Sequence, residues 1–236
     1  PSYIVDPTAV DELQDVARIS GMPDISRRSL IHALNMRAVT REYAKSVGKK
    51  FEEVNCIVAH MGGGCTTGVI TNGKWIDMYN GLDGDGAFAP TRSGAVPVGD
   101  LIRLCYSGKY PTVDAMMKRA VGDAGIVAYL GTADMREVNK MIENGDKKAK
   151  LIKEAFIYQH AKDIGALATV LHGKVDAILL TGGIAYGKDI VDGIASYVDW
   201  IAPVVAIPGE REMIALAQGA LRVLTGEEEA KTYEAE

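Results

Sequence analysis

The sequence has few of the residues that would mark a disulfide-rich, metal-binding or nucleic-acid-binding protein. Its 3 cysteines, Cys56, Cys65 and Cys105, have neither metal-ligand nor disulfide-framework spacing, so we expect reduced thiols. There is no block of basic residues, and 26 Lys and Arg against 31 Asp and Glu give a net charge of −5. This balance argues against nucleic acid as the partner. We expect a small molecule instead.

Long apolar stretches are also missing. No run of residues approaches the roughly 18 apolar positions that a membrane-spanning helix needs. The first residues do not show the charged and then apolar pattern of a signal peptide. We therefore expect neither export nor membrane insertion, and a cytoplasmic location. Apolar residues nevertheless make up 47% of the 236 residues, which is enough for a sizeable core in one large or two small domains.

What the sequence does have is glycine at the ends of predicted strands. Gly62, Gly63 and Gly64 follow the apolar run 54–59 and precede two strands that are joined by Asn-Gly at 72–73. Three consecutive glycines leave their amide groups open to an approaching anion such as phosphate. A tight hairpin without a ligand is the alternative for this pattern taken alone.

A second strand end with glycines lies at residues 175–185. There a buried strand runs into Thr181, Gly182 and Gly183 and then into a helix. Such a turn lets the backbone pack closely against a flat ligand such as a nucleoside. The stretch is neither a P-loop nor a dinucleotide-binding fingerprint, because the spacing of glycines and lysine that each requires is absent.

Three polar residues near predicted element ends are candidates for chemistry. Asp6 follows a short apolar strand, where open α/β sheets place ligand contacts, although Asp before proline also starts turns. His32 lies near the start of a helix predicted over 29–47, and a structural role is its alternative. Arg92 lies in the glycine-rich loop 80–94 and could bind a phosphate or carboxylate in a bidentate way, with a solvated loop arginine as the alternative.

The order of the remaining patterns predicts an α/β protein without a solenoid repeat. Residues 122–132 read as a connector, and the charged tail 227–236 is expected to fray. We expect strands at 1–7, 54–59, twice within 69–78, 175–180 and 204–207, and helices at 11–19, 29–47, 98–107, 113–119, 135–143 with Asp134 as its N-cap, 147–171, 189–198 and 212–225.

Together these pieces resemble the acetate and butyrate kinases, a family within the superfamily of acetate and sugar kinases, heat-shock ATPases and actin. The His-Met-Gly-Gly-Gly stretch and the Leu-Thr-Gly-Gly-Ile-Ala-Tyr stretch are more similar to butyrate or branched-chain fatty acid kinases than to the HLGNG and FTGGIGEN of acetate kinases. The resemblance runs from Pro1 to about Glu228. Its motifs are residues 4–7 (IVDP), 29–35 (SLIHALN), 60–64 (HMGGG), 91–94 (TRSG) and 180–186 (LTGGIAY).

The resemblance implies a ribonuclease H-like, actin-like ATPase domain that is the second half of a duplicated two-domain kinase. Residues 1–29 would end the core of the first domain, residues 30–210 would form the second ribonuclease H-like domain, and residues 211–236 would be a helix returning to the first domain plus a frayed tail. The family's first phosphate hairpin, of the Asn-Pro-Gly-Ser-Thr-Ser-Thr-Lys type, has no counterpart here. We therefore expect a missing N-terminal segment or chain as a partner, and a homodimer or larger assembly.

The activity implied by the resemblance is reversible, ATP-dependent phosphorylation of a short-chain fatty acid, butyrate or a branched-chain acid, to its acyl phosphate, with Mg²⁺ as the metal and ADP as the other product. A carboxylate is already a nucleophile at neutral pH, so direct in-line transfer needs alignment and charge neutralisation rather than a general base. Two alternatives stay open. One is a non-catalytic nucleotide-binding fragment or subunit, which the missing hairpin supports, and the other is an acetate or propionate kinase.

The resemblance also implies roles for the candidate residues. Arg92 would bind the carboxylate or the transferring phosphoryl group, and His32 and His60 would hydrogen-bond its oxygens. Asp6 would hold Mg²⁺. The nucleotide would lie along the amides of Gly62, Gly63 and Gly64, and its adenosine would lie between Gly182, Gly183 and Ile184 on one side and Asp134, Met135 and Arg136 on the other.

A second metal ligand is harder to assign. Acetate kinases use a glutamate after the last strand, and an ungapped reading puts Arg211 at that position. Glu210 and Glu212 flank it, and we favour Glu212. Adenine contacts around Tyr186 are also expected to differ, since the family's asparagine is replaced there.

Overall fold

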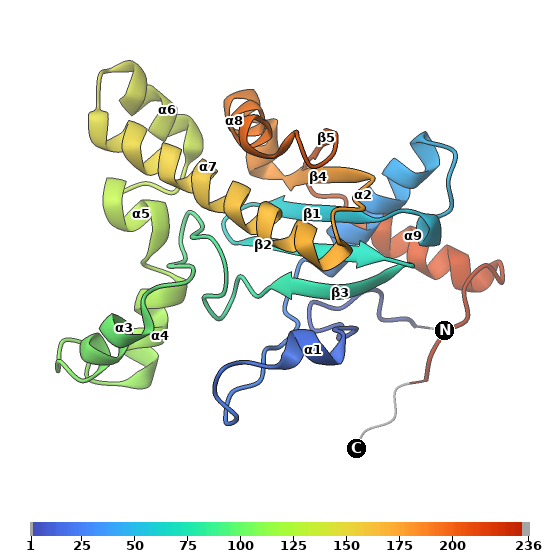
Figure 1. Ribbon diagram of the computed structural model, residues 1–236, viewed down its shortest axis with the longest axis horizontal. Coiled ribbons are helices and arrows are strands. Elements are labelled where there is room, and N and C mark those ends of the chain that lie inside the picture. The colour runs from blue at the N-terminus through green and yellow to red at the C-terminus, as the bar shows by residue number, and fades with distance from the viewer. Residues whose placement is uncertain (1, 233–236) are drawn as a thin grey trace.

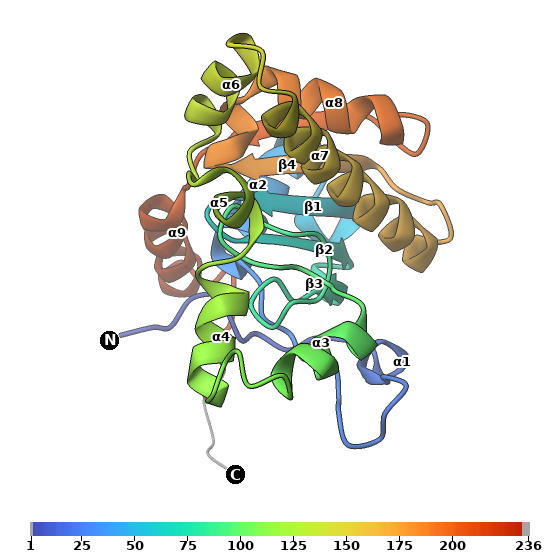
Figure 2. The same ribbon diagram turned by 90° about the vertical axis from the view of Figure 1, so that its left-hand side faces the viewer.

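A five-stranded sheet with helices on both faces forms the body of the protein (Figures 1 and 2). The structure is a computed structural model that describes residues 2–232. The strand order is β3-β2-β1-β4-β5, with β1 parallel to β4, β4 parallel to β5, and the other pairs antiparallel. The strands are β1 (Cys56–Met61), β2 (Cys65–Thr71), β3 (Lys74–Tyr79), β4 (Ala177–Gly182) and β5 (Val204–Pro208).

The helices lie in two layers and one outlying group. Helices α7 and α8 cover one face of the sheet, α2 covers the other with α9 packed against it, and α3 and α4 stand away from the sheet (Figures 1 and 2). No helix within residues 2–232 has the length and apolarity needed to span a membrane. The helices are α1 (Asp15–Arg18), α2 (Ala33–Ser46), α3 (Val98–Cys105), α4 (Val113–Val121), α5 (Gly125–Leu130), α6 (Met135–Glu143), α7 (Lys147–Ala168), α8 (Lys188–Val198) and α9 (Glu212–Leu224), with 3₁₀ turns η1 (Phe51–Glu53), η2 (Thr169–Leu171) and η3 (Gly183–Tyr186).

Alternation along the central strands gives the sheet two apolar cores. In β1, Ile57 and Ala59 face α7 and α8, whereas Val58 faces α2, and all three are fully buried. Side chains of a strand alternate between the two faces, so a strand that is covered on both faces is apolar throughout. In both β1 and β4 the penultimate residue breaks this rule. His60 and Thr181 are polar, and both lie on the α2 face.

Most of the expected elements are confirmed. The glycine stretch joins β1 to β2, and Asn72-Gly73, both with positive φ, joins β2 to β3. Residues 80–94 form a loop without helix or strand. Asp134 caps α6 by accepting a hydrogen bond from the amide of Arg136 at 2.8 Å. Helices α2 and α7 are shorter than expected, because α2 begins at Ala33 and the last turn of the long helix is the 3₁₀ turn η2.

Three expectations are wrong. Residues 2–7 are not a strand, since no described strand pairs with them, and Pro1 lies outside the described residues. Only Asp15–Arg18 of the helix expected at 11–19 forms. The connector 122–132 contains the helix α5, which begins where Ala89 and Pro90 accept its first amide hydrogen bonds. In the tail that is expected to fray, Glu228 pairs with Arg222 at 2.8 Å, and residues 233–236 lie outside the described residues, so this expectation stays a prediction.

The ends of the described chain lie together. Helix α9 packs on α2, and a Cβ placed on Gly219 of α9 would lie 2.4 Å from the Cγ1 of Val5. Val5 therefore packs on the last helix, whereas Glu12 and Gln14, closer to α1, hydrogen-bond to the backbone of β3. The division into 1–29, 30–210 and 211–236 stays a prediction.

The close packing of Gly182 predicts an effect of its substitution on stability. Its φ is +85°, and an added Cβ would lie 2.4 Å from the carbonyl oxygen of Met61 on the neighbouring strand. We expect Gly182→Ala to lower the free energy of unfolding by about 3 kcal/mol, because the backbone strain and the clash add. Denaturant unfolding measures this. Gly183→Ala is the matched control, since nothing lies within 4 Å of its Cβ, and equal losses in both variants would contradict the explanation.

Candidate functional site

Three polar residues lie side by side across the sheet, where β1 and β4 end. His60 pairs in register with Thr66 of β2 and with Thr181 of β4. All three are almost fully buried and face α2. We call these three residues the polar row. Buried polar groups need hydrogen-bond partners, and the partners come from the first turn of α2.

The N-terminal end of α2 covers the polar row. His32, the N-cap residue of α2, places its Nδ1 2.9 Å from the Oγ1 of Thr66. Asn35, one turn further, places its Nδ2 3.0 Å from the Nδ1 of His60 and 3.1 Å from the Oγ1 of Thr181. The rings of His32 and His60 stack at 3.9 Å with an angle of 10° between their planes. The structure thus brings the two predicted histidines into one contact pair.

Both histidines are neutral at physiological pH. Burial, with the nearby charge of Arg92, lowers the pKa of His32 to about 4. Burial, with the neighbouring His32, lowers the pKa of His60 to about 3. Desolvation disfavours the charged form of an imidazole, and two stacked rings cannot both carry a charge without strong repulsion. At pH 7 this pair can donate hydrogen bonds but cannot serve as a pair of cations.

Arg92 lies against the glycine turn that follows β1. A Cβ on Gly64 would lie 2.4 Å from the Cζ of Arg92, so the guanidinium occupies the space that a side chain at position 64 would need. The Nη1 of Arg92 donates to the carbonyl oxygen of Gly81 at 3.1 Å, and Thr91 donates to the carbonyl oxygen of Gly63 at 3.1 Å. The loop 80–94 is therefore fastened directly to the turn.

The turn uses one of its own amides. The N–H of Gly62 donates to the carbonyl oxygen of Gly64 at 3.1 Å. The amides of Gly63 and Gly64 donate to no backbone carbonyl within residues 2–232, and Gly63 is exposed. Of the three predicted anion-binding amides, these two are the ones that remain able to face a ligand.

An apolar pocket of about 1230 Å³ adjoins Arg92. Its walls come from the loop 80–97, from α3, α4 and α5, and from one face of α7. Arg92 contributes to the lining together with apolar side chains such as Leu101, Met116, Ala128 and Ile152. A ligand with one anionic end and one apolar end would find both kinds of surface here.

Side chains of α7 hold the loop that carries Arg92 by hydrogen bonds to its backbone amides. The carboxylate of Asp163 accepts from the amide of Ala87 at 2.6 Å, and Gln159, one turn earlier, accepts from the amide of Phe88 at 3.5 Å. Burial raises the pKa of Asp163 to about 6, with Asp85 adding to the rise and the amide of Ala87 and Lys162 opposing it. Asp163 is thus a buried acid whose charge is costly at neutral pH.

The predicted adenosine residues lie on two elements that flank α7. Gly182 and Gly183 connect β4 to η3, and Ile184 packs against the core under α7 and α8. Met135 begins α6, while the side chain of Arg136 is exposed and pairs with Asp134, whose pKa it lowers to about 2.

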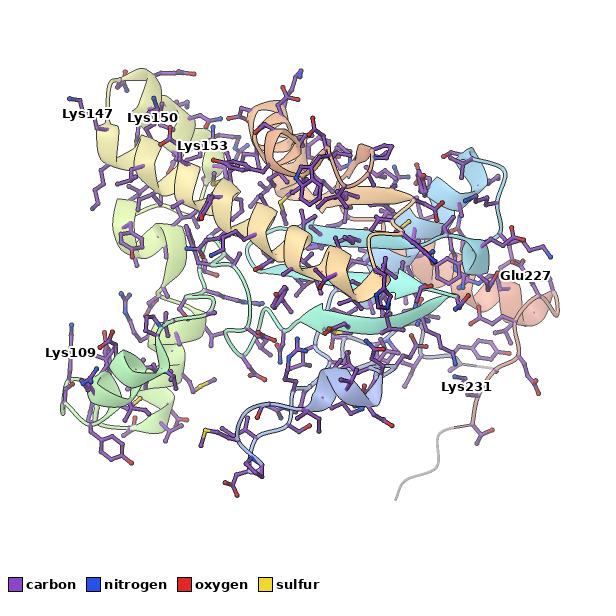
Figure 3. The ribbon with its side chains drawn as sticks, in the orientation of Figure 1. Lys109, Lys147, Lys150, Lys153, Glu227 and Lys231 are labelled. Atoms are coloured by element: carbon purple, nitrogen blue, oxygen red, sulfur yellow. The ribbon has the colours of Figure 1, made fainter. Side chains whose placement is uncertain are left out.

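Lys153 links helix α6 to helix α8. It lies on α7, labelled in Figure 3, donates to Asn139 of α6 at 2.6 Å and pairs with Asp189 of α8. Its side chain is only 12% exposed. Helices α6 and α8 are therefore linked through one largely buried lysine.

Asp6 is not brought to the histidines. Its backbone has φ +42°, and its carboxylate pairs with Arg37 at 2.8 Å in the contact between α2 and α9. Burial raises the pKa of Asp6, while Arg37, Arg41 and Arg222 lower it. A dication beside three guanidinium groups would be repelled.

The other predicted metal ligands do not complete a site either. Glu210 and Glu212 are both exposed, and Arg211 between them pairs with Glu42 at 3.1 Å. No cluster of three His, Cys, Asp or Glu residues that could hold a metal ion exists within residues 2–232. The donors present therefore do not fit a magnesium site, and we derive no chemical step through the metal.

Comparison with known proteins places the chain. Residues 24–196 match the acetokinase family. The chain belongs to this family. Butyrate kinase 1 of Clostridium acetobutylicum is 56% identical over 233 residues, which cover 99% of this chain and 65% of that protein. A probable butyrate kinase of Clostridium botulinum is 54% identical with the same coverage, so the acetokinase chain spans about 65% of the length of these relatives.

Solved structures agree on the fold of this acetokinase chain. The crystal structure of Porphyromonas gingivalis acetate kinase has a TM-score of 0.79 at 21% identity, covering 89% of this chain and 61% of that one. A propionate kinase from Francisella tularensis has a TM-score of 0.75 at 25% identity, with 88% and 60% covered. The sheet order and these likenesses show the expected ribonuclease H-like fold of the actin-like ATPases.

Sequence reasoning missed the residues that support the site of this acetokinase chain without an implied ligand contact. Asn35, Thr66, Thr181 and Asp163 were not assigned, although Asn35 and Thr181 stand inside two of the motifs. The signal for three of them is a polar residue at an apolar position, at the end of a buried strand or on the buried face of a helix. Asp163 gives no such signal, because acids are common on long exposed helices.

Asp163 predicts a pH dependence of stability. Its pKa is about 6 in the folded chain against 3.8 as the usual value, so the stabilisation linked to its proton is complete below about pH 4 and is lost as the pH rises through 6. Asp163→Asn keeps an acceptor for the amide of Ala87. We expect its free energy of unfolding to exceed that of the wild type by an amount that grows to about 3 kcal/mol between pH 4 and pH 7.

Denaturant unfolding at several pH values measures this difference. Asp24→Asn, at an exposed loop position, is the matched control and should show no such growth. A constant difference between Asp163→Asn and the wild type across this range would show that Asp163 carries its charge at no cost.

Proposed function

We propose that this chain carries the phosphoryl-transfer site of an ATP-dependent kinase that converts a short-chain fatty acid, butyrate or a branched-chain acid, to its acyl phosphate, reversibly. The observation that carries the proposal is the placement of Arg92 between an open glycine turn and an apolar pocket. A short fatty acid has the matching chemistry, because its carboxylate can meet the guanidinium while its alkyl chain enters the pocket. Relatives that are identical to this chain at more than half of the aligned positions are named butyrate kinase or probable butyrate kinase, which supports the proposal.

The reaction needs no general base. A carboxylate oxygen of the acid forms a bond to the γ-phosphorus of ATP while the bond from that phosphorus to the bridging oxygen breaks, and ADP leaves with the electron pair. No proton has to move at pH 7. The neutral histidines fit this scheme, since a pair with pKa values of about 4 and 3 is a poor acceptor of protons at that pH.

The chain's own residues would align the groups and spread the charge. Arg92 supplies the positive charge closest to the turn and would hold the carboxylate or the transferring phosphoryl group. His32, at the N-terminal end of α2, and His60, near the end of β1, would donate hydrogen bonds to its oxygens, and the helix N-terminus itself favours anions. The amides of Gly63 and Gly64 would line the path of the β- and γ-phosphates.

The remaining ligand contacts follow the resemblance. Adenosine would lie between the turn at Gly182, Gly183 and Ile184 and the segment Asp134–Arg136. We propose Mg²⁺ as the metal that accompanies the nucleotide phosphates.

The complete enzyme would contain more than the described residues. The relatives are longer, and we propose that a further N-terminal segment or chain completes the phosphate site. We also propose a homodimer or larger assembly in the cytoplasm, which is supported by the exposed apolar side chains of the outlying α3–α4 pair, among them Val98, Ile102 and Val113. No residue of these two helices is buried.

Two other functions are the alternatives. A non-catalytic nucleotide-binding subunit would keep the turn after β4 but would not need Arg92 beside the glycine turn. An acetate or propionate kinase would use the same polar groups with a smaller apolar pocket. The names of the similar proteins favour butyrate over these shorter acids.

Acyl phosphate formation tests the proposal. The chain is incubated with ATP, Mg²⁺ and butyrate, alone and joined to the N-terminal third of a butyrate kinase relative, and the product is trapped with hydroxylamine. We expect product from the joined protein, with butyrate or isobutyrate preferred over acetate. ATP binding without product from any of these acids would favour the nucleotide-binding subunit. A preference for acetate would favour an acetate or propionate kinase.

Removal of the guanidinium tests the role of Arg92. We expect Arg92→Ala to lower kcat on the order of a hundredfold, because a charge partner of the transition state is lost. Arg92→Lys keeps the charge but not the planar bidentate group, so we expect it to recover only part of the rate. Steady-state kinetics of the joined protein measure both. An unchanged kcat in Arg92→Ala would remove this residue from the mechanism.

The glycine turn gives a second kinetic test. In Gly64→Ala the new Cβ would meet the guanidinium of Arg92, so the flexible side chain moves and the fold stays intact. We expect kcat to fall on the order of tenfold or more, since a shift of about 1 Å in a positioning group is costly. Gly21→Ala, outside the proposed site, is the control, because its Cβ meets nothing within 4 Å. Equal rates in the two variants would show that the position of Arg92 is not critical.

A further inference from the structure

We propose that Asn35 is a positioning residue that fixes the tautomer of His60, keeping the ring hydrogen on Nε2 so that the ring donates a hydrogen bond toward the glycine turn. This inference deepens the proposed function and rests on it only for the identity of the group that accepts the bond. The geometry of Asn35 itself stands on contacts inside the chain.

The orientation of the Asn35 side-chain amide is settled by a backbone group. Its Oδ1 accepts from the N–H of Arg211 at 3.0 Å. A backbone N–H can only donate, so the oxygen must be on this side, and a flipped amide would set two donors against each other. Arg211 precedes α9, after the last strand. A residue on α2 is thus oriented by the chain that leaves β5.

The other side of the amide therefore presents Nδ2, which can only donate. Its two hydrogens have two acceptors, the Nδ1 of His60 at 3.0 Å and the Oγ1 of Thr181 at 3.1 Å. Thr181 passes its own hydrogen on to the carbonyl oxygen of Gly209 at 3.3 Å. Every donor in this hydrogen-bond network has an acceptor. Reversing the direction of any one of these hydrogen bonds would leave a buried donor facing another donor.

It follows that Nδ1 of His60 carries a lone pair. A neutral imidazole has a single N–H, which must then be on Nε2. Burial and the neighbouring His32 lower the pKa of His60 to about 3, so the doubly protonated ring is absent at pH 7. Asn35 acts in the same direction, since its N–H would oppose a proton on Nδ1.

The Nε2 atom points at the glycine turn. A Cβ on Gly62 would lie 3.4 Å from this nitrogen, and no described residue gives Nε2 a hydrogen-bond partner. The charged and titratable groups around the ring are His32, stacked on it, and Arg92, whose charge acts on His32. The acceptor that fits is an anionic oxygen, carboxylate or phosphoryl, held between this N–H and the guanidinium.

The opposite tautomer would be unsuitable for such a ligand. With the hydrogen on Nδ1, the Nε2 lone pair would face the anionic oxygen and repel it. Asn35 therefore decides whether His60 attracts or repels the group that Arg92 binds. This gives a buried side chain, out of reach of any ligand, a direct effect on the site.

Nitrogen NMR of the histidine rings tests the proposal on the chain as it exists. There are 4 histidines, and a His60→Gln variant assigns the signals of interest. In the wild type at pH 7 we expect an unprotonated Nδ1 and a protonated Nε2 for His60. A protonated Nδ1 would overturn the proposal without any variant being needed.

The variant Asn35→Asp provides the second test of the proposed tautomer. One carboxylate oxygen still accepts from Arg211, but the other now faces Nδ1 and requires a hydrogen there, so we expect the ring to carry a proton on Nδ1. Asn55→Asp, which makes the same change at the other end of β1, is the matched control and should leave the His60 signals unchanged. Unchanged His60 signals in a folded Asn35→Asp variant would also overturn the proposal.

Kinetics of the joined protein separate this inference from the proposed function. We expect Asn35→Asp to lower kcat on the order of tenfold or more, with a smaller change in the KM for ATP, because the altered group faces the transferring group rather than the nucleotide base. Ring signals as expected in a protein that phosphorylates no acid would leave the role of Asn35 intact and defeat the kinase proposal. An unchanged kcat together with a shifted tautomer would show that His60 does not touch the reacting group.

Discussion

The parallel pairing of β1 with β4 is the interaction on which the site depends. It places His60 beside Thr181 and brings the glycine turn after β1 next to the glycine turn after β4. Gly182 allows the two strands to approach so closely that a Cβ there would meet the backbone of Met61. Both turns then lie at the same edge of the sheet, as the carboxyl ends of parallel strands do. Strand pairing alone thus joins the phosphate-facing and the nucleoside-facing halves of the proposed site.

A second layer of contacts converts this edge into a polar site. The N-terminal end of α2 supplies His32 and Asn35 above the sheet, while α7 holds the loop of Arg92 from the other side through Asp163 and Gln159. The result combines two neutral imidazoles and two free amides with one guanidinium. Such a set stabilises a developing negative charge without offering a base, which suits a nucleophile that is already ionised.

Asp6 shows where the described residues stop supporting the family pattern. Its motif, Ile4-Val5-Asp6-Pro7, predicts a strand that ends at a metal ligand, but residues 2–7 have no neighbouring strand to pair with. A strand without a partner leaves its backbone groups unpaired, and the segment packs instead on α9, where Asp6 pairs with Arg37. The strand prediction failed because strand formation depends on a partner that the sequence of one segment does not supply, and the metal role of Asp6 stays a prediction.

Local patterns were enough for much of the rest. Alternating and helical spacing located the sheet and its covering helices, and the glycines marked both turns, because a turn that requires positive φ or close backbone approach admits little else. The motifs named His32, His60 and Arg92. Their stacking, their lowered pKa values and the place of the guanidinium against Gly64 could not be read from the sequence.

The sequence by itself determined the α/β class, the order of the elements and the family to which the chain belongs, since each of these follows from short-range pattern. Only the tertiary structure decided that Asn35 orients His60, that Asp163 supports the loop of Arg92, and that Asp6 lies away from both. These relations join residues from 25 to 76 positions apart in the chain. Hydrogen bonds and burial at such separations arise from the packing of the whole sheet, and no local spacing encodes them.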